Sequence, residues 1–192
     1  MVGDYGTNMA MAVQQRRKAR PPLTAAKLEE MALGYVGRFA TSRAKLRTYL
    51  QRKLRERGWD GDAEPPVEAL ADKFVRLGYV DDRAFALSKA RSLTGRGYGA
   101  RRVRQALAVA GIDEEEGAEA RNYAEEEAVE AALRFARRRA LGPFAVRTPN
   151  TQERERALAA MIRAGHGFAI ARAIIDLAPG EKPDIEVLTI LC

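Results

Sequence analysis

One helix-ending pattern occurs three times in this 192-residue chain at nearly constant spacing. In each copy, two apolar residues stand four positions apart, and a glycine follows four positions later. The copies end at Gly58, Gly111 and Gly165, which lie 53 and 54 residues apart. Glycine permits the left-handed backbone that ends a helix. A constant period of this size predicts tandem modules, each about three helices long, that stack because none can bury its apolar face alone. The three copies are Leu50–Leu54–Gly58, Val103–Leu107–Gly111 and Ala157–Met161–Gly165.

Helical signals fill the rest of the chain, and strand patterns are absent. Thr24, Ser42 and Pro65-Pro66 are residues that begin helices. The helix after Pro66 is expected to turn Val67, Leu70, Phe74 and Leu77 inward. The second helix of the first module is expected to be about one turn longer than that of the second module. The third module carries an inserted loop at residues 142–150.

We therefore predict an all-α fold of three tandem three-helix repeats that form an elongated, curved array. The predicted boundaries are residues 23–79, 80–122 and 123–179 for modules 1, 2 and 3. Residues 1–22 are predicted to be a disordered basic tail, because they are polar and end in arginines and two prolines. Residues 180–192 show no clear helical register and are predicted to be a loose C-terminal tail.

The net charge of +7 is concentrated in two segments. Residues 23–58 carry nine basic and three acidic side chains, and residues 81–112 carry seven and two. This distribution favours a polyanionic partner, either nucleic acid or an acidic protein surface, although well-solvated helix faces would look the same. The single cysteine, Cys192, excludes a disulfide framework and a cysteine zinc site. This cysteine usage fits the cytoplasm of a reducing cell, and we expect a monomer there. No stretch approaches the roughly 18 apolar residues of a membrane helix.

Arginine gathers on the second helix of the first two modules. If the modules stack in similar orientations, these faces form one positive strip that can bind carboxylate or phosphate groups. The alternative is a merely solvated surface. The run Arg134–Ala140 follows three glutamates, Glu125–Glu127, and intrahelical pairing is expected to account for much of its charge. The predicted strip consists of Arg43, Lys45, Arg47, Arg52 and Lys53 in module 1, Arg101, Arg102 and Arg104 in module 2, and Arg96 and Tyr98 in the preceding loop.

Two adjacent aspartates, Asp81 and Asp82, raise the question of catalysis. Neighbouring side chains diverge, and the only histidine, His166, belongs to another module, so no catalytic pair is completed. We instead expect Asp82 to cap a helix and both charges to favour its positive end. No catalytic, metal-binding or cofactor-binding residue is predicted, and no cofactor. The expected inter-module joint consists of Gly78, Tyr79, Asp81, Asp82 and Phe85, with Tyr79 and Val80 packed back.

Two further residues are assigned structural positions. His166 lies in a glycine-flanked turn and is expected at the surface. Trp59 follows the helix-ending Gly58 and is expected to pack on the joint between helices.

Three segments carry a family resemblance. YVGRFATSRAKLRTYLQRKL, LGYVDDRAFALSKARS and GYGARRVRQALAVAGID together resemble the RecX family of regulatory proteins, over roughly Leu23 to Leu177. The third module departs from the family pattern, because RAGHGF stands where an arginine-rich RRGF ending is usual. The resemblance implies a non-enzymatic protein that binds the RecA recombinase and its filament on single-stranded DNA, usually limiting filament growth and RecA activities.

Two other function classes remain open at this point. A helical repeat protein that binds DNA or RNA directly, without a RecA role, would share the salt-sensitive basic surface. A nuclease or other metal enzyme using Asp81 or Asp82 would show magnesium-dependent cleavage, which the sequence supports little.

Overall fold

The computed structural model describes residues 20–191. The predicted tail up to residue 19, and Cys192, lie outside these residues. Within them the chain forms ten α-helices and a short 3-10 helix, and β-structure is limited to an isolated bridge between Leu23 and Trp59. No helix in this part of the chain is long and apolar enough to cross a membrane. The helices are α1 (Ala25–Val36), α2 (Arg43–Arg57), α3 (Val67–Arg76), α4 (Asp82–Gly95), α5 (Ala100–Val109), α6 (Ala118–Glu126), α7 (Ala128–Arg139), η1 (Gly142–Phe144), α8 (Thr151–Arg163), α9 (Phe168–Asp176) and α10 (Ile185–Ile190).

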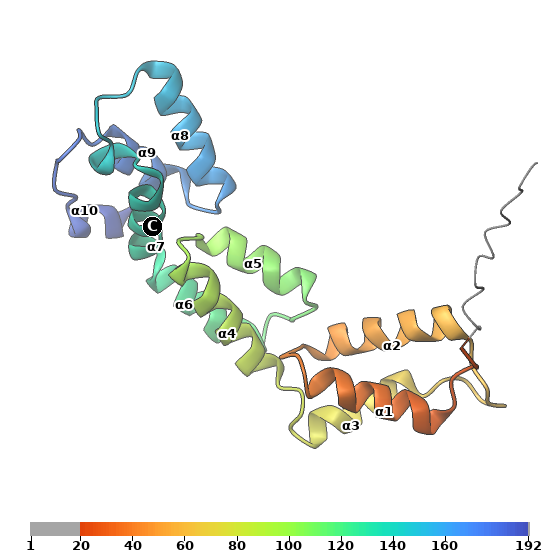
Figure 1. The fold of residues 1–192 in the computed structure, drawn as a ribbon. Coiled ribbons are helices and arrows are strands. Elements are labelled where there is room, and N and C mark those ends of the chain that lie inside the picture. The colour runs from red at the N-terminus through yellow and green to blue at the C-terminus, as the bar shows by residue number, and fades with distance from the viewer. Residues whose placement is uncertain (1–19, 192) are drawn as a thin grey trace, which may run out of the picture.

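The helices are arranged as three successive groups along a bent, elongated row: α1–α3, α4–α6 and α7–α10 (Figure 1). This confirms the all-α repeat fold. Each group buries its own apolar cluster, around Leu46 and Leu50 in module 1, Val103 and Leu107 in module 2, and Met161 in module 3. Tyr98 packs against the clusters of both module 2 and module 3, whereas the clusters of modules 1 and 2 have no member in common among the described residues.

Helix starts and lengths agree with the sequence in module 1. The side chain of Thr24 accepts a hydrogen bond from the backbone of Lys27, and that of Ser42 accepts one from Lys45. Helix α2 has 15 residues against 10 in α5. Leu77 was expected to face inward but is 57% exposed, because it is the C-cap of α3 rather than part of its buried face.

Two predicted boundaries differ from the structure. The division at residue 122 falls inside α6, which extends to Glu126 and packs on α4. The C-terminal stretch is not a loose tail, because Asp184 caps α10 and Leu188 is buried in the module 3 cluster. A six-residue helix with one buried residue shows no periodicity in its sequence, so the pattern could not reveal it.

The second helices of the three modules meet end to end. At the first joint, the hydroxyl of Ser42, which caps α2, donates to the carbonyl of Ala110, the C-cap of α5, at 2.5 Å. At the second joint, the N–H of Gly99, which caps α5, donates to the carbonyl of Ala164, the C-cap of α8, at 3.0 Å. Each contact satisfies a carbonyl that a helix end leaves free and aligns two helix dipoles head to tail. Figure 1 shows α2, α5 and α8 following one another along one side of the row.

The periodic glycines are located at these contacts. Gly111 and Gly165 have φ angles of +69° and +96°. A Cβ atom at Gly111 would lie 2.3 Å from the Cβ of Ala44, and one at Gly165 would lie 2.5 Å from the backbone nitrogen of Arg102. Both neighbours belong to the first turn of the preceding module's second helix. Glycine at these two positions therefore allows one module to approach the next closely, in addition to ending a helix.

Gly58 occupies the same periodic position at the free end of α2. Its φ is +81°, but a Cβ there would meet only the Cβ of Pro22, at 3.9 Å. The fully buried Leu23 takes the place of a further module. Its N–H donates to the carbonyl of Gly58 at 3.0 Å, and its carbonyl accepts from Asp60 at 2.9 Å. Trp59 packs beside it on the module 1 cluster, as expected from the sequence. Leu23 thus covers the C-terminal end of α2.

Two glycines with similar positive φ angles provide a matched test of the first joint. Gly78→Ala should cost about 1 kcal/mol, since a Cβ there would meet nothing within 4 Å and only the left-handed backbone is penalised. Gly111→Ala should cost at least about 2 kcal/mol, because the methyl group also forces Ala44 away. Urea unfolding of both variants measures the difference. Equal losses of unfolding free energy would show that Gly111 does not depend on the neighbouring module.

Candidate interaction surface and its joints

The two arginines in the first turns of α2 are paired within module 1. The guanidinium of Arg43 lies 2.5 Å from a carboxylate oxygen of Asp72, and that of Arg47 lies 2.6 Å from Glu68. Both acids belong to α3. The two arginines therefore tie α2 to α3, and their charges are largely compensated.

Further along α2, Arg52 and Lys53 lie beside an aromatic pair. Both form an ion pair with the carboxylate of Glu56, Arg52 at 3.7 Å and Lys53 at 2.5 Å. The hydrogen bond from Lys53 lowers the pKa of that carboxyl group. Both also lie over the ring of Tyr49, at 5.7 and 5.9 Å from its centroid. Tyr49 in turn stacks on Tyr35, with centroids 4.2 Å apart. One carboxylate compensates two cations here, so part of the positive charge remains available.

Lys45 connects the predicted strip to the predicted joint. Its ammonium group lies 5.2 Å from the ring centroid of Phe85, on α4 of the next module. A cation over a ring keeps its full charge. The structure therefore brings together Lys45 and Phe85, which sequence reasoning had assigned to separate sets.

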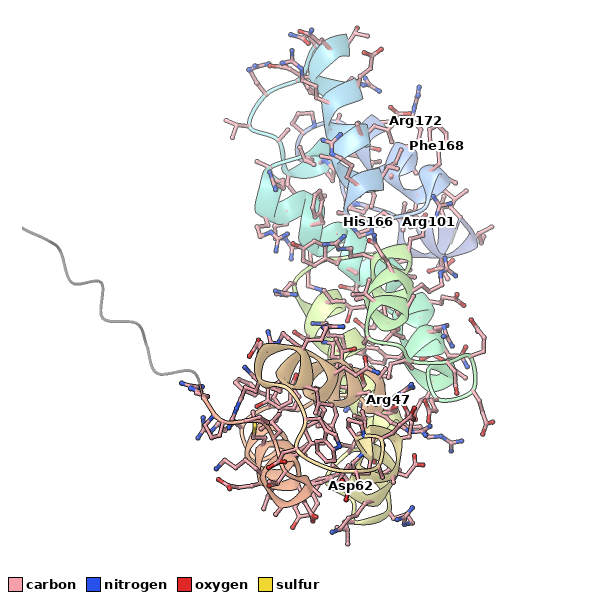
Figure 2. The ribbon with its side chains drawn as sticks, turned by 90° about the vertical axis from the view of Figure 1, so that its right-hand side faces the viewer. Arg47, Asp62, Arg101, His166, Phe168 and Arg172 are labelled. Atoms are coloured by element: carbon pink, nitrogen blue, oxygen red, sulfur yellow. The ribbon has the colours of Figure 1, made fainter. Side chains whose placement is uncertain are left out.

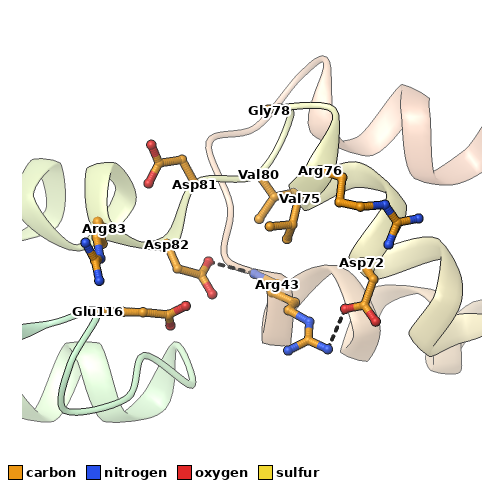
Figure 3. A pocket seen from close by; sticks show the side chains of 10 residues that line it. All are labelled: Arg43, Asp72, Val75, Arg76, Gly78, Val80, Asp81, Asp82, Arg83 and Glu116. Atoms are coloured by element: carbon orange, nitrogen blue, oxygen red, sulfur yellow. Dashed lines mark hydrogen bonds and ion pairs between the residues drawn. The ribbon is translucent and has the colours of Figure 1, made fainter.

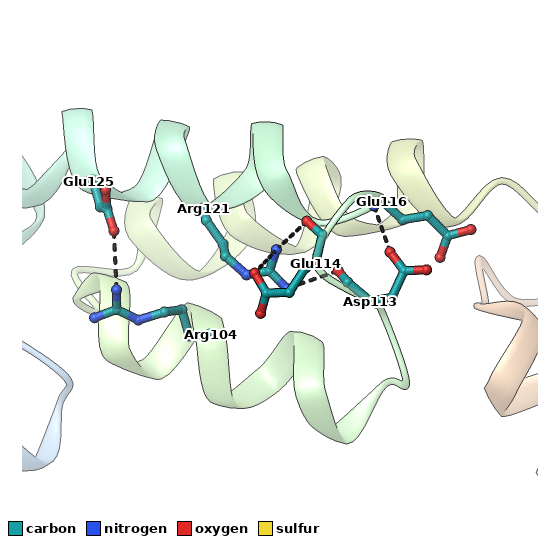
Figure 4. Close-up of polar contacts among 6 residues, drawn as sticks. All are labelled: Arg104, Asp113, Glu114, Glu116, Arg121 and Glu125. Carbon is teal, nitrogen blue, oxygen red and sulfur yellow. Dashed lines mark hydrogen bonds and ion pairs between the residues drawn. The ribbon is translucent and has the colours of Figure 1, made fainter.

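The three arginines of α5 are exposed but differ in their partners. Arg104 pairs with Glu125 at 3.1 Å (Figure 4), and Arg102 donates to the neutral amide of Gln105 at 2.8 Å. The guanidinium of Arg101 has no protein partner among the described residues. Figure 2 shows Arg47 on the first module and Arg101 close to His166, where modules 2 and 3 meet. The uncompensated charge of α5 is thus that of Arg101 and Arg102.

Arg96 and Tyr98 belong to a fixed segment rather than to a flexible loop. Arg96 lies over the ring of Tyr98 at 5.4 Å, and its carbonyl accepts from the guanidinium of Arg138. A Cβ at Gly97, where φ is +79°, would lie 2.9 Å from the backbone nitrogen of Phe135. This loop is therefore part of the joint between modules 2 and 3.

Asp81, and not Asp82, caps α4. The carboxylate of Asp81 accepts from the N–H of Ala84 at 2.9 Å. Asp82 instead reaches across the joint and accepts from the N–H of Arg43 at 2.8 Å (Figure 3). The prediction was wrong by one residue because the first N–H groups of two helices, from different modules, compete for adjacent carboxylates. Asp82 thus accepts a hydrogen bond from the N-terminus of α2 rather than from that of its own helix.

Three of the predicted joint residues, Gly78, Asp81 and Asp82, line a groove of about 530 Å³ between modules 1 and 2, whereas Tyr79 and Phe85 do not (Figure 3). Burial raises the pKa of Asp82, opposed by the N–H of Arg43. Burial and the charge of Asp82 raise the pKa of Glu116. No group of three or more His, Cys, Asp or Glu side chains among the described residues is arranged to hold a metal ion.

The backbone before the aspartates turns at Gly78, where φ is +74°. Val80 is buried, as expected. Tyr79 was also expected to pack back, but it is 55% exposed and only tilts against Phe74, with ring centroids 5.6 Å apart. The turn therefore anchors module 1 through Val80 and leaves most of Tyr79 in solvent.

His166 is buried at the second joint, contrary to the expectation of a surface residue. Only 3% of it is exposed, its Nε2 lies 3.1 Å from the carbonyl of Gly97, and its ring meets Phe135 edge-on. Burial lowers its pKa to about 4, so the imidazole is neutral at pH 7. The preceding Gly165 allows the close approach of α5 at this joint, whereas the sequence pattern indicated only a turn.

The basic run after Glu127 is also arranged differently from the prediction. Only Arg134 pairs with one of the three glutamates, Glu127, at 2.6 Å. Arg137, Arg138 and Arg139 lie instead over the rings of Phe144 and Phe135. Sequence reasoning ranked these arginines low because it could not foresee that the glutamates point elsewhere.

The two aspartates should respond differently to substitution. Asp81→Ala should cost about 1 kcal/mol, the usual value of a lost cap. Asp82→Asn should leave the protein as stable or more stable at pH 7, because it keeps an acceptor for Arg43 and removes a charge disfavoured by burial. The raised pKa means that the contribution of Asp82 is full below pH 3.8 and lost as pH rises through its folded value. Denaturant unfolding at pH 7 checks this, and a loss in Asp82→Asn equal to that in Asp81→Ala would contradict it.

His166 should make the fold sensitive to mild acid. Because its folded pKa of about 4 lies below the ordinary 6.5, its stabilisation is full above pH 6.5 and is lost as pH falls toward 4. The loss can reach about 3 kcal/mol. His166→Gln keeps an N–H donor for Gly97 without titrating in this range, so its unfolding free energy should fall less. Parallel pH profiles of the two proteins would refute this role.

Comparison with known proteins agrees with the repeat architecture. Residues 81–120 match the family model described as the second three-helix domain of RecX. Regulatory protein RecX of Myxococcus xanthus (strain DK1622) is 39% identical over 163 residues, covering 79% of this chain and 86% of the relative. Regulatory protein RecX of Agrobacterium fabrum (strain C58 / ATCC 33970) is 32% identical over 146 residues, covering 73% and 77%.

Two solved structures share the fold. The crystal structure of RecX from Lactobacillus salivarius superposes with a TM-score of 0.57 at 18% identity, covering 79% of this chain and 94% of that one. A second crystal structure, of regulatory protein RecX, gives 0.59 at 21% identity, covering 79% and 71%. Together with the 39% identity to the Myxococcus xanthus protein over most of both chains, these findings establish that the chain belongs to the RecX family of regulatory proteins.

Proposed function

We propose that this protein is a non-enzymatic regulator of recombination and DNA repair. It binds the RecA recombinase and its filament on single-stranded DNA, and limits filament growth and RecA activities. Membership of a family whose relatives carry the name regulatory protein supports this role. The observation that carries it is the end-to-end contact of α2 and α5, which sets the uncompensated cations Lys45, Arg101 and Arg102 on two successive helices of one line.

The proposed mechanism uses shape and charge, without a chemical step. A bent row of modules is suited to lie along the helical groove of a filament, where it contacts more than one protomer. Guanidinium groups without carboxylate partners are free to meet acidic protein surface or phosphate. A protein bound in this way obstructs either the addition of the next protomer or access to the groove.

Charge reversal in α5 tests the assignment. Arg101→Glu together with Arg102→Glu should raise the concentration needed for half-inhibition of the RecA ATPase on single-stranded DNA about tenfold or more. The matched control, Arg76→Glu with Lys182→Glu, reverses two exposed cations that lie outside the second helices. It should inhibit like the wild type. Circular dichroism confirms that both variants keep their helices.

Two results would count against the proposal. Undiminished inhibition by the α5 variant would remove α5 from the interface. If the wild-type protein leaves the ATPase unchanged at every ratio to RecA, the recombinase is not its partner.

A further inference from the structure

Four arginines form a second positive surface outside the α2–α5 line. They are Arg96, in the loop before α5, and Arg137, Arg138 and Arg139, in the last turn of α7. All four are exposed. We call them the ring-anchored arginines, because each lies over an aromatic ring of modules 2 and 3.

The anchoring contacts are specific. Arg137 lies 4.8 Å from the ring centroid of Phe144, and Arg96 lies 5.4 Å from that of Tyr98. Arg138 and Arg139 both lie 5.6 Å from the centroid of Phe135, which is only 3% exposed. Arg138 also donates to the carbonyl of Arg96, which joins the loop to α7. The four side chains are therefore held by the joint between modules 2 and 3.

These cations keep their charge. Ring contacts orient a guanidinium without neutralising it. None of the four makes an ion pair with a carboxylate in the described part of the chain, whereas the preceding arginine of α7, Arg134, pairs with Glu127 at 2.6 Å. The C-terminal end of α7 favours positive charge, which lowers the cost of gathering three arginines there. The surface is thus a pre-oriented set of donors that lacks an anion.

The composition of this surface favours nucleic acid over an acidic protein as its partner. Protein partners usually bury an apolar centre surrounded by polar groups. None of the large apolar side chains that are exposed in the described residues falls within 96–98 or 134–144. Interfaces with nucleic acid are more polar and more positive, and a planar guanidinium can donate two hydrogen bonds to one phosphate. The features of the ring-anchored arginines are those of a phosphate-binding surface.

We propose that the ring-anchored arginines bind the phosphate backbone of single-stranded nucleic acid directly, without a requirement for RecA. This goes beyond the proposed regulatory function and is independent of it. The surface recognises repeated phosphates, so it binds without strong sequence preference. It would give modules 2 and 3 a second point of attachment to a filament that contains DNA.

The salt dependence of binding tests this contact. The probe is a fluorescein-labelled oligothymidylate, and fluorescence anisotropy gives the association constant at several sodium chloride concentrations. Arg137→Gln with Arg139→Gln removes two charges and leaves the Arg138–Arg96 link in place. Its plot of log K against log salt should be shallower than that of the wild type by about 1.4, the value for two lost contacts to a single strand.

Two further variants sharpen the result. Arg156→Gln with Arg163→Gln removes two exposed arginines of the same module, on α8, and should keep the wild-type slope. Arg137→Lys with Arg139→Lys should also keep the slope but bind several-fold more weakly, because lysine cannot make the paired hydrogen bonds. Circular dichroism verifies that each variant is folded.

Three outcomes would overturn the proposal. These are an absence of oligothymidylate binding by the wild type at low salt, an unchanged slope in Arg137→Gln/Arg139→Gln, and equal slope changes in that variant and the α8 control. Since the assay contains no RecA, each of these outcomes leaves the proposed regulatory function untouched. Conversely, failure to inhibit the RecA ATPase would leave this proposal standing.

Discussion

The hydrogen bond between the cap of one second helix and the C-terminal carbonyl of the next organises this molecule. Ser42 meets Ala110 at the first joint, and Gly99 meets Ala164 at the second. A helix end otherwise leaves such carbonyls without a protein partner. Because the contact needs the two backbones to approach closely, it demands glycine just beyond the C-caps of α5 and α8, at Gly111 and Gly165. At the last free end, Leu23 makes the same kind of contact with Gly58.

The two joints share this contact but differ in the groups around it. The first joint is polar, with Asp82 bound to the N–H of Arg43 beside a groove of about 530 Å³. The second joint is apolar and more closely packed, with Tyr98 shared by two cores and His166 buried against Phe135. Burial favours the neutral form of a titratable group at both joints. It therefore raises the pKa of the acid Asp82 and lowers the pKa of the base His166.

The features that depend on local sequence could be predicted. Helix ends at Gly58, Gly111 and Gly165, the caps at Thr24 and Ser42, and the segregation of arginine on α2 and α5 were of this kind. Features that depend on another segment could not be predicted. The partners of Arg43 and Arg47 lie on α3, so their charge looked available when it was not. The roles of Asp81 and Asp82 depend on the position of α2. The burial of His166 depends on its contact with Gly97. The positions of the α7 arginines depend on aromatic rings rather than on the nearby glutamates.

We propose that the line of second helices, held end to end at the joints, is the surface that meets the recombinase. Hydrogen–deuterium exchange of the full chain, with and without RecA filaments on single-stranded DNA, tests it most directly. We expect the filament to slow exchange in α2 and in the first turns of α5, from Ala100 onward. Protection confined to α9 and α10, with α2 and α5 unchanged, would contradict it.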